Sequence, residues 1–357
     1  MNNKSKNDSF EIARVAGVSR STVSRVLNRP EIVSEDTRRR VMNVIAQHSY
    51  TPNLSAQLLT GMKPYTIGLF ICTQPPSGRQ TIEDSQFDYI LRCVLSSASI
   101  RNYHTLVTLV FDRDNPAIHQ KIKEMFLQNR IEGGVFIGFP DYYPVIETLI
   151  DKQNIVGIFD GDVSCKHEPN RIVINFDSLV GESAVDYLVS MGHHDIAAVH
   201  GDMRRHNARQ KHDGFLRGMI KHQLSVRDDW MLFGDFDSEQ TACQIDKLLK
   251  SGGDLPTAIF ATNDRTAYVT IQALNNNGLR VPDDISIVGV DDEVLSRYFT
   301  PKLTTFRINF KQMLDVLIGK VIEAVEQPLE QQFTDTFSAT LVERDSCRRI
   351  PGSNRYF

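Results

Sequence analysis

The sequence predicts a small all-α headpiece built around a helix-turn-helix, followed by an α/β body of two doubly wound, parallel-sheet subdomains. Three observations lead to this prediction. Lys and Arg are concentrated in the first 63 residues, a helix-turn-helix pattern lies within them, and short apolar runs alternate with longer amphipathic segments from Thr66 onward. A chain of 357 residues is long enough for two or three domains, each with its own core.

The net charge of −4 conceals two opposite charges. Residues 1–63 contain ten basic residues (Lys and Arg) and five acidic residues (Asp and Glu), which gives a net charge of +5. Residues 64–357 contain 30 basic and 39 acidic residues, which gives a net charge of −9. A basic module attached to an acidic body indicates that only the first segment binds a polyanion.

Residues 10–28, FEIARVAGVSRSTVSRVLN, are typical of two helices joined by a tight turn. Ala13 and Val23 are spaced for a close crossing of the two helices, and Gly17 is free to adopt the positive φ that such a turn needs. Ser19 is a suitable N-cap for the second helix, predicted over residues 20–27.

The polar face of this second helix carries Arg20, Ser21, Ser24 and Arg25. A guanidinium matches the two acceptors of a guanine edge, and hydroxyls match phosphate oxygens. We therefore predict a DNA recognition helix, although an ordinary solvated pair of amphipathic helices would show the same short pattern.

Two further helices are predicted before the body. Ser34 is placed to cap a third helix, whose Val41, Val44 and Ile45 cover the first two. The next segment, YTPNLSAQLLTG, has Pro52 near its start and Gly61 at its end and encloses barely two turns. A helix this short needs a partner to be stable, so it can act as a switch.

At these residues the chain resembles the LacI/GalR family of bacterial transcription repressors. The resemblance lies in AGVSRSTVSRVLN, in the later VS with Thr37, and in TPN with Ala56 and Leu59, and it continues to about residue 346. It implies that Arg20, Ser21, Arg25 and Leu59 contact bases. Leu59 would wedge into the minor groove, or alternatively pack only within the hinge. It further implies that these residues contact or support the phosphate backbone: Ser19, Thr22, Ser24, Asn28, Thr37, Tyr50, Asn53 and Ala56.

The chain departs from the family pattern at its start. Asp8 and Ser9 stand where the family usually has Thr and an apolar residue, and Glu11 replaces the usual Asp. Because an acidic group near phosphate opposes binding, we expect the first phosphate contact to be disturbed.

The body contains Val/Ile-rich runs at roughly 30-residue spacing with amphipathic segments between them, as in parallel βαβ units. The runs are TIGLFI, TLVTLVF, GGVFIGF, NIVGIFD, RIVINF, DIAAVHG, TAIFAT and ISIVGV. Ligands of such folds bind beyond the carboxyl ends of the strands. Asp160, Asn263 and Asp291 lie at such ends, where each could also simply cap the next helix.

Carboxylates and an amide near an aromatic ring suit the hydroxyls and the apolar face of a sugar. The family resemblance implies a periplasmic-binding-protein-like body of two subdomains crossed by three strands, with the effector between them. It assigns effector contacts to Asp160, Lys211, Phe236, Asn263, Asp291 and Phe310.

The effector site also departs from the family pattern. Lys211 replaces the Arg of the family's R-x-x-G-F, so a point charge stands in place of a bidentate fork. Ile308 stands where some members carry a polar residue, and Cys72 and Thr73 could either touch the ligand or merely end a strand. The identity of the effector therefore does not follow from that of a relative's effector.

Several classes of protein are not supported. The chain has no G-x-x-x-x-G-K-[ST], G-x-S-x-G or H-E-x-x-H motif, so we expect no catalytic residues, no cofactor and no metal. Its five cysteines are odd in number and widely spaced, which argues against a disulfide framework and against a zinc site. The polar start and the lack of about 18 consecutive apolar residues predict a cytoplasmic protein without a membrane segment, nucleoid-associated when bound to DNA.

The expected function is a sequence-specific transcription regulator, most simply a repressor of a carbohydrate-utilisation operon. A homodimer would bind a pseudo-palindromic DNA operator under the control of a sugar or sugar-phosphate effector. The C-terminal tail has no apolar heptads, which argues against a tetramer. A sugar-binding or transport receptor is the main alternative, but it leaves the basic headpiece unexplained. An enzyme on an α/β scaffold lacks an evident nucleophile or phosphate loop.

The expected domains follow from this interpretation. Residues 8–51 form the headpiece, 52–63 the hinge helix and linker, 64–346 the effector-binding and dimerisation domain, and 347–357 a short tail. Within the body, the first subdomain is predicted over about 64–162 and 310–333, and the second over about 163–307 and 334–346.

Overall fold

The structure, a computed structural model, describes residues 9–50, 63–73, 84–139, 143–161, 168–176, 178–235 and 237–350, without the side chains of Asn28 and of residues 84–87. The chain divides into two compact units, Met1–Pro64 and Tyr65–Phe357. Each unit has its own hydrophobic core, so each is described by itself.

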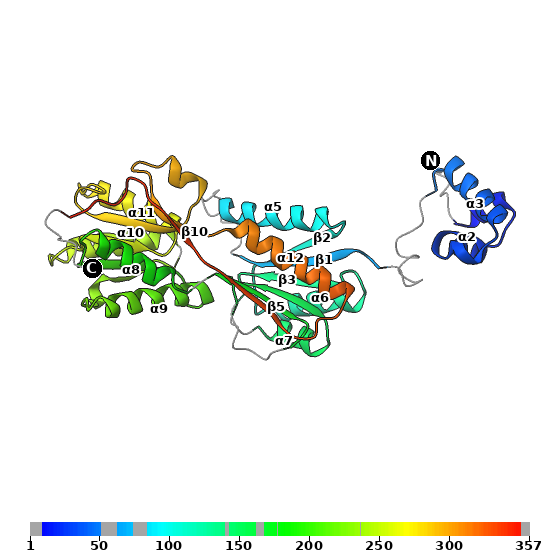
Figure 1. Ribbon diagram of the computed structural model, residues 1–357, viewed down its shortest axis with the longest axis horizontal. Coiled ribbons are helices and arrows are strands. Elements are labelled where there is room, and N and C mark those ends of the chain that lie inside the picture. The colour runs from blue at the N-terminus through cyan, green and yellow to red at the C-terminus, as the bar shows by residue number, and fades with distance from the viewer. Residues whose placement is uncertain are drawn as a thin grey trace. The chain divides into compact units, whose positions relative to one another are not determined.

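The first unit is a helical headpiece (Figure 1). Its described elements are α1 (Ser9–Ala16), α2 (Arg20–Asn28), a short 3-10 turn η1 (Pro30–Ile32) and α3 (Glu35–Gln47). Ile12, Ala13, Val23 and Val41 are buried between the three helices, in agreement with the predicted close crossing.

The turn and the caps of the headpiece test three predictions. Gly17 has a φ of +65°, and Ser19 Oγ accepts a hydrogen bond from Thr22 N at 3.1 Å, so both predictions are confirmed. Ser34 does precede α3, but its hydroxyl donates to Thr37 Oγ1 at 2.9 Å instead of capping the helix. The prediction of a hydroxyl cap at Ser34 is therefore wrong, because its Oγ is turned toward Thr37 Oγ1 and accepts no hydrogen bond from a backbone N–H of α3.

The first sheet of the body consists of parallel strands. In spatial order they are β11 (Phe333–Phe337), β5 (Arg171–Phe176), β4 (Ile155–Phe159), β3 (Gly133–Ile137), β1 (Thr66–Cys72) and β2 (His104–Val110). The helices packed on it are α5 (Asp84–Ile100), α6 (Pro116–Leu127), α7 (Pro144–Asp151) and α12 (Phe310–Glu326). Figure 1 shows α5 and α12 on one face and α6 and α7 on the other.

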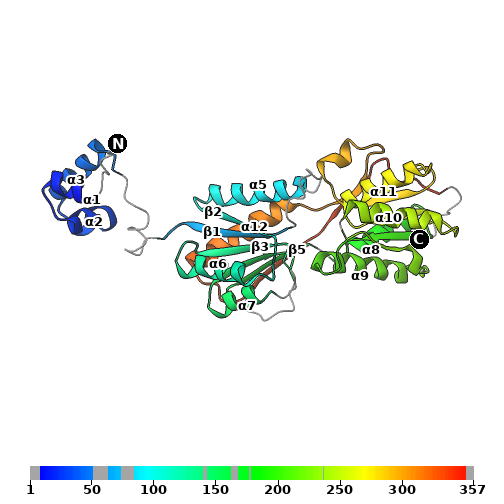
Figure 2. The same ribbon diagram turned by 180° about the vertical axis from the view of Figure 1, so that it is seen from behind.

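The second sheet is parallel except at one edge, where β12 runs antiparallel to β10. In spatial order its strands are β12 (Thr340–Val342), β10 (Thr304–Arg307), β9 (Ser286–Asp291), β8 (Ala258–Ala261), β6 (Ile196–His200) and β7 (Met231–Phe233). Helices α8 (Val180–Ser190) and α9 (His206–Lys221) cover one face, and α10 (Ser238–Lys250) and α11 (Asp264–Asn276) cover the other (Figure 2). Short 3-10 turns η2 (Asp228–Trp230) and η3 (Val294–Arg297) complete the subdomain.

Both sheets are buried on two faces, which explains why their strands read as continuous apolar runs. Leu69 and Phe70 of β1 enter the cores on opposite faces of the first sheet. Ala198 and Val199 of β6 do the same in the second sheet. The predicted fold class is confirmed.

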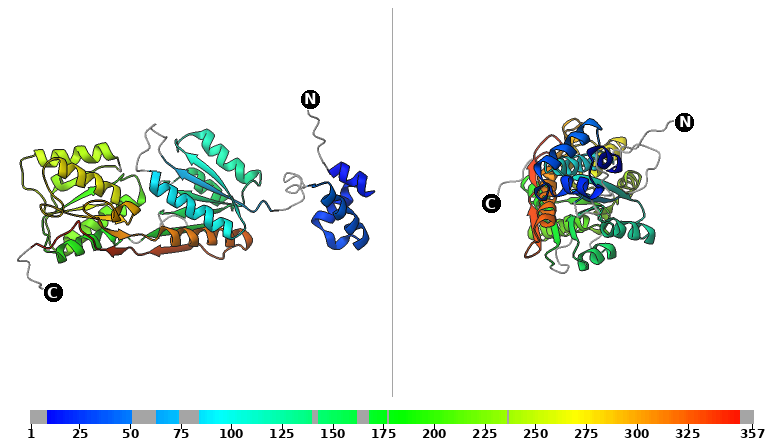
Figure 3. Two further views of the ribbon diagram at one scale, coloured as in Figure 1. Left: turned by 90° about the horizontal axis from the view of Figure 1, so that it is seen from above. Right: turned by 90° about the vertical axis from the view of Figure 1, so that its right-hand side faces the viewer.

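The chain crosses between the two subdomains three times, from β5 to α8, from β10 to α12 and from β11 to β12 (Figure 3). The predicted boundaries near residues 162 and 333 are corrected by this topology. Residues 171–176 pair with β4, and residues 333–337 pair with β5, so both strands belong to the first sheet. An apolar run predicts a buried strand but does not determine the strand with which it pairs.

Helices α8 and α9 pack unusually closely because glycines face the contact. A Cβ atom on Gly181 would lie 2.2 Å from Lys211 O and 2.6 Å from Phe215 N. A Cβ on Gly214 would lie 2.7 Å from Ser178 O. The backbone of α9 is thereby held against α8 at Lys211, a predicted effector contact.

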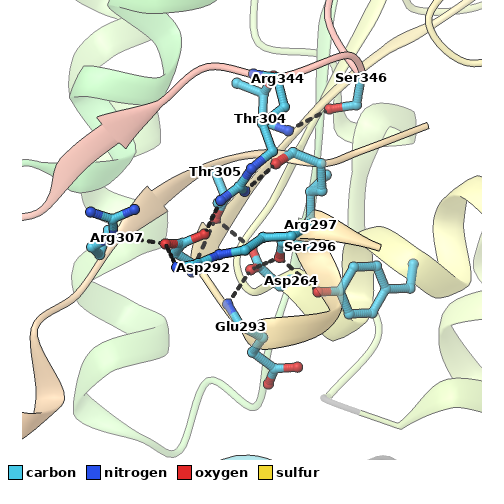
Figure 4. Close-up of polar contacts among 12 residues, drawn as sticks. Asp264, Asp292, Glu293, Ser296, Arg297, Thr304, Thr305, Arg307, Arg344 and Ser346 are labelled. Atoms are coloured by element: carbon cyan, nitrogen blue, oxygen red, sulfur yellow. Dashed lines mark hydrogen bonds and ion pairs between the residues drawn. The ribbon is translucent and has the colours of Figure 1, made fainter. Parts of the chain in front are cut away.

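A fully buried carboxylate, Asp264, links three elements of the second subdomain (Figure 4). Its Oδ2 accepts hydrogen bonds from Ser296 Oγ at 2.5 Å and Glu293 N at 2.9 Å, and its Oδ1 accepts one from Thr305 Oγ1 at 2.5 Å. Burial, followed by the charge of Asp291, raises the pKa of Asp264 well above its usual range. The three donors oppose that shift and tie α11, η3 and β10 together.

A second carboxylate, Asp292, holds two of the crossings (Figure 4). Its side chain is 2% exposed and is contacted by Arg307 Nε at 2.7 Å, by Arg344 Nη2, and by Arg297 Nη2 at 3.6 Å. Arg307 ends β10 just before the chain enters α12, and Arg344 follows β12. Asp292 thus anchors the second-subdomain ends of both connections.

The glycine contact between α8 and α9 leads to a stability prediction. Gly181→Ala should lower the free energy of unfolding by about 1–3 kcal/mol or more, because the new methyl group meets backbone atoms that cannot turn aside. Gly253→Ala is the control, since this exposed glycine has no positive φ and a Cβ there would meet no atom closer than 3.7 Å. The control should change the free energy of unfolding by at most about 0.5 kcal/mol. Urea unfolding followed by circular dichroism measures both, and equal effects would contradict the explanation.

Glu293 leads to a pH prediction. Burial and the charge of Asp291 raise its pKa from 4.5 to about 7. The folded state therefore binds this proton more tightly than the unfolded state, so the stabilisation is complete below pH 4.5 and is lost as the pH rises through about 7. Glu293→Gln should flatten the fall in melting temperature between about pH 5 and pH 8. The exposed Glu330→Gln variant should keep the wild-type slope, and an unchanged slope in Glu293→Gln would disprove the assignment.

Candidate DNA surface and effector site

Helix α2 presents the predicted base-reading residues to solvent. Arg20, Ser21 and Arg25 are exposed, whereas Val23 and Val26 of the same helix are buried in the headpiece core. Arg20 Nε donates to Ser9 Oγ of α1 at 3.2 Å, which orients its guanidinium. The amphipathic division that the sequence predicts is therefore present, with two guanidiniums and a hydroxyl on the open side.

Hydroxyl groups gather at the start of α2. Ser19 Oγ lies 2.7 Å from Ser21 Oγ and 2.9 Å from Thr22 Oγ1. Thr22 and Ser24 are half-buried, as are Thr37 at the start of α3 and Tyr50, which packs against the headpiece core. Hydroxyls and backbone N–H groups at a helix N-terminus are suitable ligands for phosphate oxygens.

The acidic Glu11, expected to disturb the first phosphate contact, has a local counter-charge. Arg14 Nη2 lies 2.6 Å from Glu11 Oε1, and Arg14 Nε also donates to the carboxylate. Both groups are partly or largely exposed, so the pair adds little stability, but it offsets the charge of Glu11 on this surface.

Some predicted residues lie outside the described segments of the chain. These are Asn53, Ala56 and Leu59 of the hinge, Phe236 of the effector site, and Asp8. Asn28 is the last residue of α2, but its side chain is not among those described.

The three polar residues predicted at strand ends occupy those positions. Asp160 follows β4 with a φ of 59°, Asn263 follows β8, and Asp291 ends β9 with a φ of 121°. Asn263 Oδ1 accepts a hydrogen bond from Thr266 N at 2.8 Å, so this residue does cap α11, as the alternative interpretation held. Asp291 and Asn263 are both more than 90% buried.

Lys211 connects the two subdomains at these strand ends, whereas Phe310 packs within the first. Lys211 is 2% exposed, its Nζ donates to Thr262 O at 2.7 Å, and it lies 5.3 Å from the ring centroid of Phe176, the last residue of β5. Phe310 begins α12, and its ring packs at 6.1 Å from that of Phe159 at the end of β4. The end of β5 in the first sheet thus meets Lys211 of the second subdomain.

The structure adds Arg205, which the sequence reasoning missed. It precedes α9, and its Nη1 lies 3.9 Å from the position of a Cβ on Gly138, after β3. Burial raises the pKa of the Cys72 thiol at the end of β1, and the charges of Arg205 and Arg113 oppose that rise. The position of Arg205 after the run DIAAVHG was the available signal, since ligands bind beyond such strand ends.

His200 is a second residue that the sequence reasoning missed. It ends β6, is fully buried, and lies 3.4 Å from His212 Nδ1 through its Nε2. Burial and then His212 lower the pKa of His200 to about 3, so its imidazole is neutral at physiological pH. It can therefore form hydrogen bonds there without adding charge.

Two kinds of feature are missing from the described residues. None of the described helices has the length and apolar character needed to cross a membrane. The side chains that the structure describes also form no cluster of three or more His, Cys, Asp or Glu suited to a metal ion.

Two family models match the chain. Residues 10–53 match bacterial regulatory proteins of the lacI family, and residues 185–347 match the periplasmic binding protein-like domain. The first match covers α1 to α3, and the second covers most of the second subdomain and α12.

Whole-length relatives agree with these matches. The probable HTH-type transcriptional repressor ExuR of Bacillus subtilis is 29% identical over 341 residues, covering 95% of this chain and 98% of the relative. The HTH-type transcriptional repressor PurR of Erwinia tasmaniensis is 31% identical over 340 residues, covering 94% and 95%.

Among solved structures, a Lac repressor dimer bound to operator and the anti-inducer ONPF superposes with a TM-score of 0.80 at 24% identity. The match covers 96% of this chain and 99% of that one. These relatives are transcriptional repressors and not enzymes, and the chain belongs to the LacI family of bacterial regulatory proteins.

Proposed function

We propose that this regulator is a repressor that binds a pseudo-palindromic operator as a homodimer and is controlled by a small molecule bound at the strand ends of the body. The observation that carries the proposal is the exposed row of Arg20, Ser21 and Arg25 on α2, in a compact unit separate from the body. The body, with its own polar strand ends, supplies a second site.

DNA recognition would follow from the chemistry of α2. Arg20 and Arg25 can each donate two hydrogen bonds to a guanine edge in the major groove. Ser19, Thr22, Ser24, Asn28, Thr37 and Tyr50, with Asn53 and Ala56 of the hinge, would contact or support the backbone. Leu59 would enter the minor groove. The net charge of +5 on residues 1–63 implies strong dependence of binding on salt.

A homodimer is supported by apolar side chains on the surface of the body. Strand β2 is an edge of the first sheet, and Val107 and Leu109 on it are exposed. Ile100 on α5, with Val294 and Tyr298 at η3, are more than 70% exposed. An open edge strand and exposed apolar side chains favour burial against a second copy, and the related Lac repressor is a dimer on its operator.

The effector is proposed to lie among Asp160, Lys211, Phe236, Asn263, Asp291 and Phe310. Asp291 adjoins Asp292, whose carboxylate holds two of the subdomain crossings. A ligand on Asp291 would therefore act on the connections through which the subdomains move. Effector and DNA would share a coupling free energy of about 1–3 kcal/mol.

The effector class and the regulated genes are also proposals. Carboxylates beside an amide suit a hydroxylated ligand, which favours a carbohydrate-utilisation operon. Such a repressor would work in the cytoplasm, on the nucleoid when bound to its operator. A sugar-binding receptor without DNA function is the alternative, and the exposed guanidiniums of α2 count against it.

Arg20→Ala should relax the preference at one base position and cost about 1–3 kcal/mol at the preferred operator. Asn28→Ala should instead weaken binding to all operator variants alike, since a backbone contact carries no sequence information. Gel-shift titrations against single-base variants of a site selected from random DNA measure both. A uniform loss for Arg20→Ala would refute its base-reading role.

Asp291→Ala should abolish the effector response and leave operator binding intact, because Asp291 lies in the body and not in the headpiece. The effector for this measurement is the ligand that a thermal-shift screen of sugars and sugar derivatives selects. Asp283→Ala, at an exposed loop position, should respond like the wild type. If Asp291→Ala and the gentler Asp291→Asn both lose operator binding, Asp291 has a structural role.

A further inference from the structure

Lys211 is a buried cation without a carboxylate partner among the described residues. Its ammonium has three donors: one is bonded to Thr262 O at 2.7 Å, and the ammonium also lies over the Phe176 ring, 5.3 Å from its centroid. Within the described segments, no ion pair joins Lys211 to an acidic side chain, although the residue is only 2% exposed. Burying an ion without a counter-ion is costly, so this position favours a negative ligand.

A second positive charge lies at the same strand ends. The Arg205 guanidinium approaches Gly138 after β3, and its charge and that of Arg113 act on Cys72 at the end of β1. Arg205 Nε also lies at a marginal 4.0 Å from the carboxylate of Asp202, which is bonded more closely to Arg204 at 2.8 Å. Arg205 thus places a second positive charge near the ends of β1 and β3.

Three buried polar atoms around Lys211 also have no hydrogen-bond partner among the described residues. They are Thr262 Oγ1, His200 Nδ1 and Asn207 Oδ1. Thr262 contacts Lys211 directly, Asn207 lies one turn before it on α9, and His200 contacts α9 through His212. Because buried polar atoms are nearly always bonded, this group indicates a polar ligand.

We propose that the effector is a small hydroxylated anion whose carboxylate or phosphate group pairs with Lys211 and Arg205. Its hydroxyls would bond to the strand-end residues Asp160 and Asp291 and to the unpartnered atoms of Thr262 and Asn207. The proposal rests on the proposed function, because it takes these strand ends as the effector site. It names a sugar acid or a sugar phosphate as the ligand class and disfavours a neutral sugar.

The first experiment compares matched anionic and neutral ligands on the full-length protein. Thermal-shift and calorimetric titrations would use galacturonate against galactose, glucuronate against glucose, and glucose 6-phosphate against glucose. At least one anion should raise the melting temperature with increasing concentration, while its neutral partner does not. The uronates and the phosphate separate the two sources of charge, and acetate and inorganic phosphate test for binding of the bare anion.

The second experiment changes the charge of Lys211. Lys211→Met should weaken binding of the selected anion by at least about 30-fold, because one partner of a buried charge pair is lost. Lys211→Arg should retain binding more closely than Lys211→Met, since it keeps the charge. Without ligand, the melting temperature of Lys211→Met is measured to establish that the variant folds. Lys250→Met, at an exposed lysine, should behave like the wild type in both assays.

Three results would overturn the proposal: equal binding of neutral and anionic partners, no stabilisation by any anion of the panel, or unchanged binding by Lys211→Met. Operator binding is measured in parallel without ligand. If operator binding fails while a Lys211-dependent anion binds, the repressor function is wrong and the ligand class stands. The opposite outcome removes the ligand class and leaves the repressor function.

Discussion

The junction between the two subdomains depends on the buried carboxylate of Asp292. Arg307 and Arg344 reach it from two different crossings, and Arg297 adds a third guanidinium. Removing one partner of such a buried cluster leaves uncompensated charge, so the cluster behaves as a unit. Asp291 and Asp292 have φ values of 121° and 56°, a conformation uncommon outside glycine, and these contacts help to hold it.

Asp264, which follows the neighbouring strand β8, has a similar role. Its three hydrogen bonds hold η3 and β10 against the start of α11, and a Cβ on Gly289 would lie only 2.5 Å from its Oδ1. Asn263 and Asp291, both proposed effector contacts, adjoin these two carboxylates in the chain. The rigid polar network and the proposed binding site are therefore continuous, which is how a small ligand could bias two arrangements of the subdomains.

The body combines a net negative charge with a buried cation at its strand ends. A net charge of −9 over residues 64–357 disfavours binding of DNA to the body, whereas Lys211 and Arg205 add two positive charges near strand ends that also carry carboxylates. Electrostatics would thus separate DNA binding from the proposed effector binding. Phosphate would bind the headpiece, and a small anion would bind where water is largely excluded.

The sequence alone determined the helix-turn-helix, with Gly17 in its turn and Ser19 as its cap, because these depend on neighbours a few residues away. It also placed Asp160, Asn263 and Asp291 at strand ends, since runs of apolar residues mark buried parallel strands. Only the tertiary structure decided that β5 and β11 join the first sheet, that Lys211 is buried against Thr262, and that Arg205 approaches Gly138 after β3. The reason is physical: strand pairing and buried charge depend on contacts between residues far apart in the chain, which local patterns do not encode.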